Sequence, residues 1–412
     1  MTKEDFSMLQ NYDRQFECPL ERSDQGNEFE LILTCCRPVA LEVDFQRQAE
    51  LAKKNLDTNK VLELARRHKV ASLLYGNLKT HRVGTFDQVL IDELAALYKK
   101  NVHKAMKSFQ ALHQIAKSNA DFQIYVMKGL DVAVRAYHDI GVRDVGDIDL
   151  LVASEHMSAV YSNLVLQGWH SKVSLVTRFF TSKILRNSHC DLTLFQAAFP
   201  RLELHWRPTH NPYEFPMACL SSQLTSGNSS TGLYGFGNED LLIYLCVHGS
   251  KHGWGRLKWL FDLPNVIEKL NIEWDTLWQK ADRLGVSLVV QQGLMLASRF
   301  CHVELTTEIV AGFKHKISRA QWHSIREFQS GPELWMEYPP AHLLIYVWLN
   351  RIGTATTPKI FIWHLLAMFN PSINDFDLLR LPERLEYLYF IFRPFTWSIR
   401  RLKIWKARTS AA

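Results

Sequence analysis

Two aspartates, Asp147 and Asp149, interrupt an otherwise apolar stretch of the 412-residue chain. In a β-strand, side chains at i and i+2 project from one face, so these carboxylates are expected side by side while Ile148 and Leu150 turn into apolar packing. Adjacent carboxylates repel unless they are neutralised, and magnesium, which prefers oxygen ligands, is the usual partner. The pair therefore predicts a magnesium site, with a solvated strand edge and an Asp147–Arg143 ion pair as the alternative.

A third acid, Glu203, has the same form, because in R-L-E-L-H-W (201–206) one carboxylate stands between leucines in a predicted strand. If that strand lies beside the aspartate strand, the three acids converge. His205 shares the face of Glu203 and is expected to hydrogen-bond in the site, whereas Trp206 is expected in the core.

Lys128 and Gly129 end the strand-like run Q-I-Y-V-M at the point where a helical pattern begins. Free backbone N–H groups at a helix start favour phosphate, and glycine permits close approach. A phosphate cradle beside acids that bind two magnesium ions is typical of phosphoryl-group transfer, in which the metals bridge the nucleotide and the incoming oxygen nucleophile. Arg143 either contacts phosphate or balances the carboxylates.

His248 and His252 lie four residues apart on a predicted helix, which is the spacing of H-E-x-x-H zinc sites. The glutamate is missing, and Gly249 and Gly253 weaken the helix, so zinc is not expected there.

Cations follow these histidines, namely Lys251, Arg256 and Lys258. One interpretation is that the segment faces the metal site and holds the triphosphate or the base. The alternative is a helix end whose cations lie near the C-terminal dipole, with Trp254, Trp259 and Leu260 in a core. The sequence leaves both interpretations open.

The helices and strands expected to position these residues indicate an α+β fold, in which a small mixed sheet is flanked by helical N- and C-terminal regions. Apolar residues recur at intervals of three and four through residues 40–119, which favours helices. From residue 121 a strand, a helix, a strand and a helix follow, the last expected to open at Ser154. Helices return at Asn238, which is expected to cap the first of them.

Residues 189–196 and 201–206 are rich in strand formers and are expected to pair as an antiparallel hairpin. The stretch 221–237 is polar and glycine-rich, which predicts a linker or lid. The chain is accordingly divided into a helical N-terminal region (1–118), a sheet domain (119–237) and a helical C-terminal domain with a basic aromatic tail (238–412).

The composition describes a globular protein, with 47% hydrophobic and 22% charged residues. No apolar run reaches the length of a membrane span, and the first residues lack the pattern of a secretory signal, so a cytoplasmic location is expected. The seven cysteines include no C-x-x-C pair, which favours reduced and mostly buried thiols.

The net charge of +6 is confined to the tail at 393–408, which carries six cations and no acid, whereas the remainder balances 42 basic against 42 acidic residues. A nucleic-acid template is therefore not expected as a partner. The tail mixes cations with aromatic and aliphatic residues, which favours either an interfacial helix in peripheral contact with anionic lipid of the inner membrane or a solvated helix packed on the domain.

The order M-K-G, a helix, R-x-x-G-D-I-D-L-L-V and L-E-L-H-W resembles the nucleotidyltransferase superfamily related to DNA polymerase β. In particular it resembles an uncharacterised bacterial nucleotidyltransferase family often met near exopolysaccharide and peptide-modification genes. The likeness extends to residues 65–78, 248–263 and 381–394.

The resemblance implies that Asp147 and Asp149 are the metal-binding pair, that Glu203 is the third acid, and that residues 119–237 form the catalytic domain. Lys128 and Gly129 stand where the superfamily usually has glycine-serine or glycine-glycine. A lysine there would supply a charge to the triphosphate in place of a serine hydroxyl.

We therefore expect a magnesium-dependent nucleotidyltransferase that moves an NMP group from an NTP, such as ATP, to a hydroxyl or phosphate of a small-molecule, sugar or peptide acceptor. The NTP is expected between the sheet domain and the helical C-terminal domain. The alternative is a catalytically inactive nucleotide-binding or scaffold protein at a membrane surface. The predicted nucleotide-binding residues are Lys128, Gly129, Arg143, His205, His248, Lys251, His252 and Arg256.

Overall fold

The computed structural model describes residues 26–38, 41–81, 86–137, 139–172, 180, 182–224, 233–313 and 339–409, and the statements below concern these residues. The N-terminal stretch that bears on the predicted location lies outside them, as does Cys18. Of the remaining thiols, Cys219 is half-buried and the others are buried and unpaired, as expected from the sequence: Cys35, Cys36, Cys190, Cys246 and Cys301.

A six-stranded mixed sheet forms the centre of the fold, with strand order β3-β4-β2-β1-β6-β5. The central strand β2 is antiparallel to β1 and parallel to β4, while β1 is parallel to β6. The hairpins β3–β4 and β5–β6 close the two edges. The strands are β1 (Ile124–Val126), β2 (Ile148–Val152), β3 (Asp191–Leu194), β4 (Leu202–His205), β5 (Ser222–Leu224) and β6 (Leu233–Phe236).

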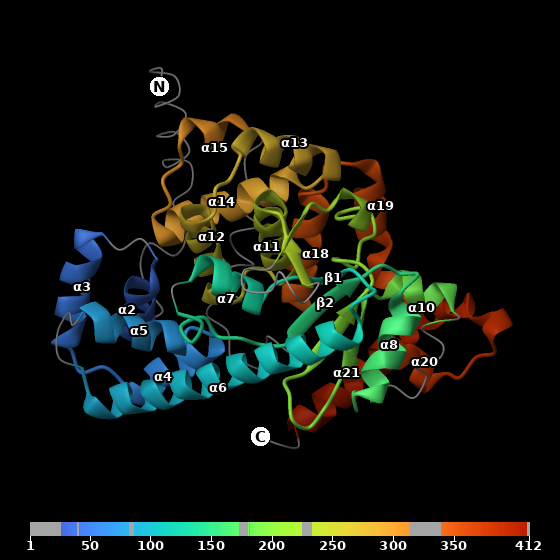
Figure 1. The fold of residues 1–412 in the computed structure, drawn as a ribbon, viewed down its shortest axis with the longest axis horizontal. Coiled ribbons are helices and arrows are strands. Elements are labelled where there is room, and N and C mark those ends of the chain that lie inside the picture. Colours follow the sequence, from blue (N-terminus) through green and yellow to red (C-terminus); the bar gives the residue numbers. More distant parts are fainter. Residues whose placement is uncertain are drawn as a thin grey trace.

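Helices surround this sheet, so the predicted α+β class is confirmed (Figure 1). Those before and within the sheet are α2 (Gly26–Cys36), α3 (Glu42–Ala52), α4 (Thr58–Arg67), α5 (Ala71–His81), α6 (Gln88–Ser118), α7 (Leu130–Ala136), α8 (Met157–Leu166) and α10 (Lys183–Ser188). Those after the sheet are α11 (Asn238–Lys251), α12 (Leu257–Lys269), α13 (Trp274–Leu284), α14 (Ser287–Cys301), α15 (Thr307–Ala311), α18 (Ala341–Gly353), α19 (Pro358–Leu366), α20 (Ile373–Leu378) and α21 (Leu388–Thr409). Short 3₁₀ turns occur at Met217–Cys219, Ala367–Phe369 and Glu383–Leu385.

Alternate side chains of the central strands enter two different cores. Leu151 of β2 belongs to one core with residues of α2, α4, α5 and α11–α14, whereas Ile148 and Leu150 belong to a second core with residues of α8, α10, α20 and α21. Figure 1 shows α11–α14 on one side of the sheet and α6, α8 and α21 on the other. Both cores draw residues from more than one of the three predicted regions, so these regions share their apolar packing.

The predicted linker or lid at 221–237 is wrong for its described part, which contains β5 and β6. The strand β6 pairs with β1, and its end residues Leu233 and Phe236 are buried. These few apolar residues are enough to hold a strand in the sheet, although the composition of the segment favoured a loop. Residues 225–232 lie outside the described residues. The helix expected at Ser154 begins at Met157, and Gly237, rather than Asn238, is the N-cap residue of α11.

The basic tail is helical, because residues 393–408 belong to α21. Arg393 and Arg400 each lie 3.1 Å from a carboxylate oxygen of Asp375 in α20, so part of the cationic charge is paired. Apolar side chains of the same helix are exposed, with Phe395 at 66% and Leu402 at 58%. The side chains of residues 401 and 403–409 lie outside the description.

None of the helices in the described ranges combines the length and the apolar character that a membrane crossing requires.

Candidate active site

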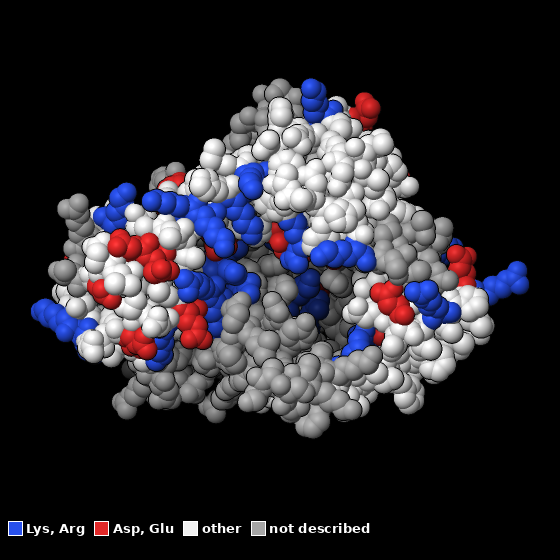
Figure 2. Space-filling view, turned by 90° about the horizontal axis from the view of Figure 1, so that it is seen from below, with Lys and Arg blue, Asp and Glu red and all other residues white. Residues whose placement is uncertain are grey.

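A cavity of about 380 Å³ lies between the sheet and the helices α11 and α12. Every residue that the sequence predicted for the site lines this one cavity: Lys128, Gly129, Arg143, Asp147, Asp149, Glu203, His205, His248, Lys251, His252 and Arg256. Figure 2 shows a hollowed face of the molecule where Lys and Arg side chains gather. The roles assigned to these residues remain predictions.

The parallel pairing of β2 and β4 brings the acids together. Asp149 stands directly opposite Glu203 in the register, and Asp147 immediately precedes β2. Because Leu150 and Leu204 are directed into the core on the far face, the carboxylates point toward α11 and α12. Asp149 is 2% exposed, whereas the side chain of Glu203 is 22% exposed and faces the cavity.

Three cations neutralise these acids. The ammonium of Lys128 lies 3.0 Å from Oδ1 of Asp149, and Arg201 contacts Asp147 and lies 3.5 Å from Glu203. The Nε2 atom of His205 lies 3.5 Å from Asp149 and 3.6 Å from Glu203. The alternative pairing of Asp147 with Arg143 is wrong, because Arg201 takes that position.

The arginine at 201 was missed by the sequence reasoning, although the signal was available. It stands two residues before Glu203, and the same i, i+2 rule that pairs the aspartates places it on the face of Glu203. Asp191 on β3 was also missed. It pairs with His205 in the β3–β4 ladder and lines the cavity.

Charge and burial shift the pKa values of this cluster. Burial raises the pKa of Asp149, but Lys128 and His205 outweigh it and hold that pKa below its usual range. Burial lowers the pKa of His205, whereas the nearby side chains of Asp149, Cys190 and Glu203 raise it, with a net result well above the usual value. The carboxylate and the imidazole therefore form a charged pair at neutral pH.

Arg143 has a positioning role in this structure. Its Nε and Nη2 atoms donate to Asp262 of α12 at 2.7 Å each, and its Nη1 donates to the carbonyl of Gly129 at 2.8 Å. Gly129 has a φ of 68°, a left-handed conformation that favours glycine. The ion pair therefore ties the turn that carries Lys128 to α12, and these contacts occupy Nε, Nη1 and Nη2 of the guanidinium.

His248 of α11 and His252, the C-cap residue of that helix, lie side by side at the cavity wall. The ring centroids of His248 and His252 lie 4.7 Å apart, and Trp259 stacks on His252 at 4.9 Å. Burial, together with nearby lysines, lowers both histidine pKa values well below the usual value, so the rings are neutral. Trp254 and Leu260 are buried in the core as the alternative interpretation expected, and Trp259 packs against that core while it also lines the cavity.

Gly249 allows this arrangement and does not interrupt α11. A Cβ atom at this position would lie 2.3 Å from the ring of Trp254, so only glycine lets that ring pack against the helix.

Lys251, Arg256 and Lys258 are half-buried and face the acids across the cavity. The ammonium of Lys258 donates to the carbonyl of Asp144 at 2.8 Å. Burial lowers the pKa of Lys258 to about 7, with a further contribution from Arg143. This wall of the cavity is therefore suited to an anionic group that restores the full charge of the lysine.

The acidic cluster fits a divalent ion. Asp149, Glu203 and His205 each offer a ligand atom, and these atoms lie within 4.8 Å of one another. Among the described residues, both ring nitrogens of His205 are buried without a hydrogen bond of normal geometry, while Oδ1 of Asp149 has the ammonium of Lys128 at 3.0 Å as its ion-pair partner. Carboxylate oxygens are the donors that magnesium prefers, and Asp147 lies beside them.

A mixed sheet that gathers three carboxylates at a cavity with a cationic far wall is an arrangement suited to phosphoryl-group chemistry. A family model described as uncharacterised nucleotidyltransferase matches residues 54–302, which is more than half of the chain. The protein belongs to this nucleotidyltransferase family, and the resemblance inferred from the motifs is confirmed. Comparison with curated proteins and with solved structures gives no significant match.

Proposed function

We propose that this protein is a magnesium-dependent nucleotidyltransferase that moves an NMP group from an NTP to an oxygen nucleophile. The observation that carries the proposal is the convergence of Asp147, Asp149 and Glu203 on one cavity whose opposite wall is cationic. The acceptor class, a hydroxyl or phosphate on a small molecule, sugar or peptide, belongs to the same proposal.

The three acids bind metal, and the more exposed of the β2–β4 pair also accepts a proton. Magnesium held by Asp147, Asp149 and Glu203 would neutralise the phosphate charge and acidify the acceptor hydroxyl. Glu203 is the more exposed carboxylate of the β2–β4 pair and takes the acceptor proton. The acceptor oxygen then bonds to the α-phosphorus while the bond from that phosphorus to the bridging oxygen breaks, and pyrophosphate leaves.

The far wall receives the leaving group. Lys251, Arg256 and Lys258 lie across the cavity from the acids and provide positive charge for the β- and γ-phosphates. The stacked rings of His252 and Trp259 offer a flat surface for the base beside them.

Nucleotide binding and pyrophosphate release test the proposal together. Thermal shift of the full chain with each NTP, with and without magnesium, is expected to show a magnesium-dependent rise in Tm for at least one NTP. Asp149→Asn is expected to abolish that rise and the pyrophosphate released on incubation with candidate acceptors. The matched control is Asp121→Asn, an exposed aspartate just before β1. Absence of any magnesium-dependent NTP effect on Tm would overturn the proposal.

A second candidate function is nucleotide binding without turnover in a protein that contacts a membrane surface. The exposed apolar side chains of α21, among them Phe395, Trp397, Ile399 and Leu402, favour peripheral contact with anionic lipid through the 393–408 tail. Magnesium-dependent NTP binding without pyrophosphate release, together with liposome binding that is lost on deletion of residues 393–412, would support this function. Pyrophosphate release that depends on Asp149 would exclude it.

A further inference from the structure

We propose that the protein holds a second metal ion, a transition metal such as Zn²⁺, at a site made by Cys190, Asp191, His205 and His210. The site lies at the β3–β4 hairpin, where Asp191 and His205 line the cavity. It contains a thiol, which the acidic cluster lacks, and it goes beyond the proposed nucleotidyl transfer.

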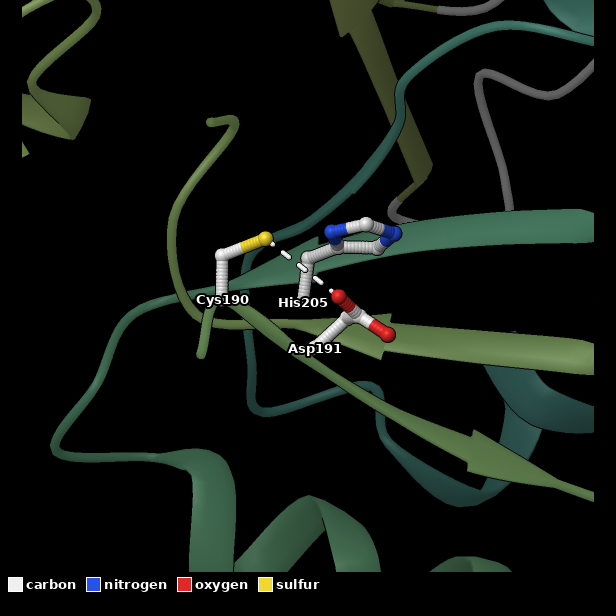
Figure 3. A group of neighbouring side chains, drawn as sticks. All are labelled: Cys190, Asp191 and His205. Atoms are coloured by element: carbon white, nitrogen blue, oxygen red, sulfur yellow. Dashed lines mark hydrogen bonds between the residues drawn. The ribbon is translucent and has the colours of Figure 1, made fainter. Parts of the chain in front are cut away.

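The hairpin places these side chains together. Cys190 immediately precedes β3, and its carbonyl accepts a hydrogen bond from the backbone N–H of Trp206 at 2.9 Å, which fixes this end of the ladder. Asp191 begins β3 and stands opposite His205 on β4. Ligand atoms of Cys190, Asp191 and His205 all lie within 4.8 Å of one another. Figure 3 shows the sulfur, the carboxylate and one ring nitrogen turned toward a common point.

A fourth donor approaches from the loop after β4. The Nδ1 atom of His210 lies 3.1 Å from the sulfur of Cys190, and the thiol also lies 3.3 Å from Oδ1 of Asp191. One thiol, one carboxylate and one imidazole lie within 4.8 Å of one another, and His210 is outside this group. Its ring would move toward the other donors to complete the tetrahedral set that zinc binds. Magnesium prefers oxygen donors, so the set discriminates against the ion proposed for the acids.

Burial gives an independent indication of a missing partner. His205 is 6% exposed, and its Nε2 lies toward Asp149 and Glu203. The other ring nitrogen, Nδ1, makes no hydrogen bond of normal geometry to the described residues. A buried donor or acceptor without a partner costs stability, so such groups in folded proteins are normally satisfied. Cys190 is 1% exposed beside this ring. A metal bound to the ring nitrogen on the Cys190 side would satisfy it.

The charges balance when the ion binds. The thiol of Cys190 loses its proton to solvent, and His205 binds in its neutral form after losing its ring proton. The thiolate and the carboxylate of Asp191 then carry two negative charges, which neutralise a divalent ion. The other ring nitrogen of His205 remains directed toward Asp149 and Glu203.

Cobalt titration of the metal-free full chain tests the site, because a thiolate bound to Co²⁺ gives a charge-transfer band in the near ultraviolet. We expect this band to appear with one equivalent of Co²⁺ and to be displaced by Zn²⁺ but not by Mg²⁺. Cys190→Ser is expected to abolish the band and to weaken zinc binding by more than about 10-fold, the loss seen for even an outer-shell partner. The matched control is Cys219→Ser, a half-buried thiol away from the cluster.

The proposal is overturned if the wild-type protein gives no thiolate band or if the band persists in Cys190→Ser. Should that variant fail to fold, His210→Ala provides the second test. It is expected to weaken zinc binding to the same extent, and an unchanged zinc affinity would contradict the proposal. Asp149→Asn is expected to keep the band while losing magnesium-dependent nucleotide binding. The failure of this site and the failure of the proposed function are therefore distinguishable.

Discussion

The buried ion pair between Arg143 and Asp262 allows a quantitative prediction. Asp262 accepts from Nε and Nη2 of the arginine at 2.7 Å each and from the hydroxyl of Tyr137 at 2.9 Å. Asp262→Ala leaves the guanidinium, whose side chain is 3% exposed, without its main counter-charge. Removing one partner of a buried pair costs about 3–5 kcal/mol. We therefore expect the free energy of unfolding to fall by that amount.

Urea denaturation followed by tryptophan fluorescence measures this loss. Glu93→Ala is the control, because its ion pair with Arg66 is half exposed, at 52% and 50%, and is worth less than about 1 kcal/mol. Replacing both buried partners, Arg143→Met with Asp262→Leu, is expected to recover much of the loss, since apolar residues of similar volume can substitute for a buried pair. A cost for Asp262→Ala no larger than that of Glu93→Ala would refute the reasoning.

Three further predictions concern the cavity and the core packing beside it. Gly249→Ala is expected to cost about 1–3 kcal/mol of unfolding free energy in urea, since its Cβ would meet the ring of Trp254 at 2.3 Å; unchanged stability would contradict this packing. Lys258 has a pKa of about 7 when folded against an ordinary 10.5, so the unfolded chain binds more protons between these values and stability rises with pH there. Lys258→Met should flatten this rise in urea titrations at several pH values, and an unchanged slope would exclude the lysine as its source. Glu203→Gln should slow pyrophosphate release about 10²–10⁴-fold while the NTP-induced rise in Tm persists, and equal rates would remove Glu203 as the base.

Much of the acidic cluster was predictable from the sequence because strand periodicity is a local rule. Asp147 and Asp149 share a face by their spacing alone, and Glu203 joins them once its strand is placed beside β2. The same rule applied to Arg201 would have found the cation that neutralises Asp147. The sequence alone predicts that these side chains share a face, because residues two positions apart in a strand project to the same side.

Other parts of the site depend on contacts between distant segments, which the sequence pattern does not encode. The partner of Arg143 is Asp262, 119 residues away. Trp259 packs against the core, as one alternative expected, but its stacking on His252 at the cavity depends on the turn after α11. The strands β5 and β6 were missed because their glycine-rich composition favours a loop, and pairing with β1 decided the outcome.

The register between β2 and β4 also bears on how the chain avoids misfolding. Side chains alternate between faces, so a slip of one residue in β2 would carry Asp149 into the apolar interior and drive Leu150 into the cavity. Burying an unpaired carboxylate among leucines is expensive, so the slipped pairing is strongly disfavoured. The carboxylates proposed for catalysis therefore also help to fix the register of β2 against β4. Replacing one by an apolar residue, as in Asp149→Leu, should make the slipped register more accessible during folding.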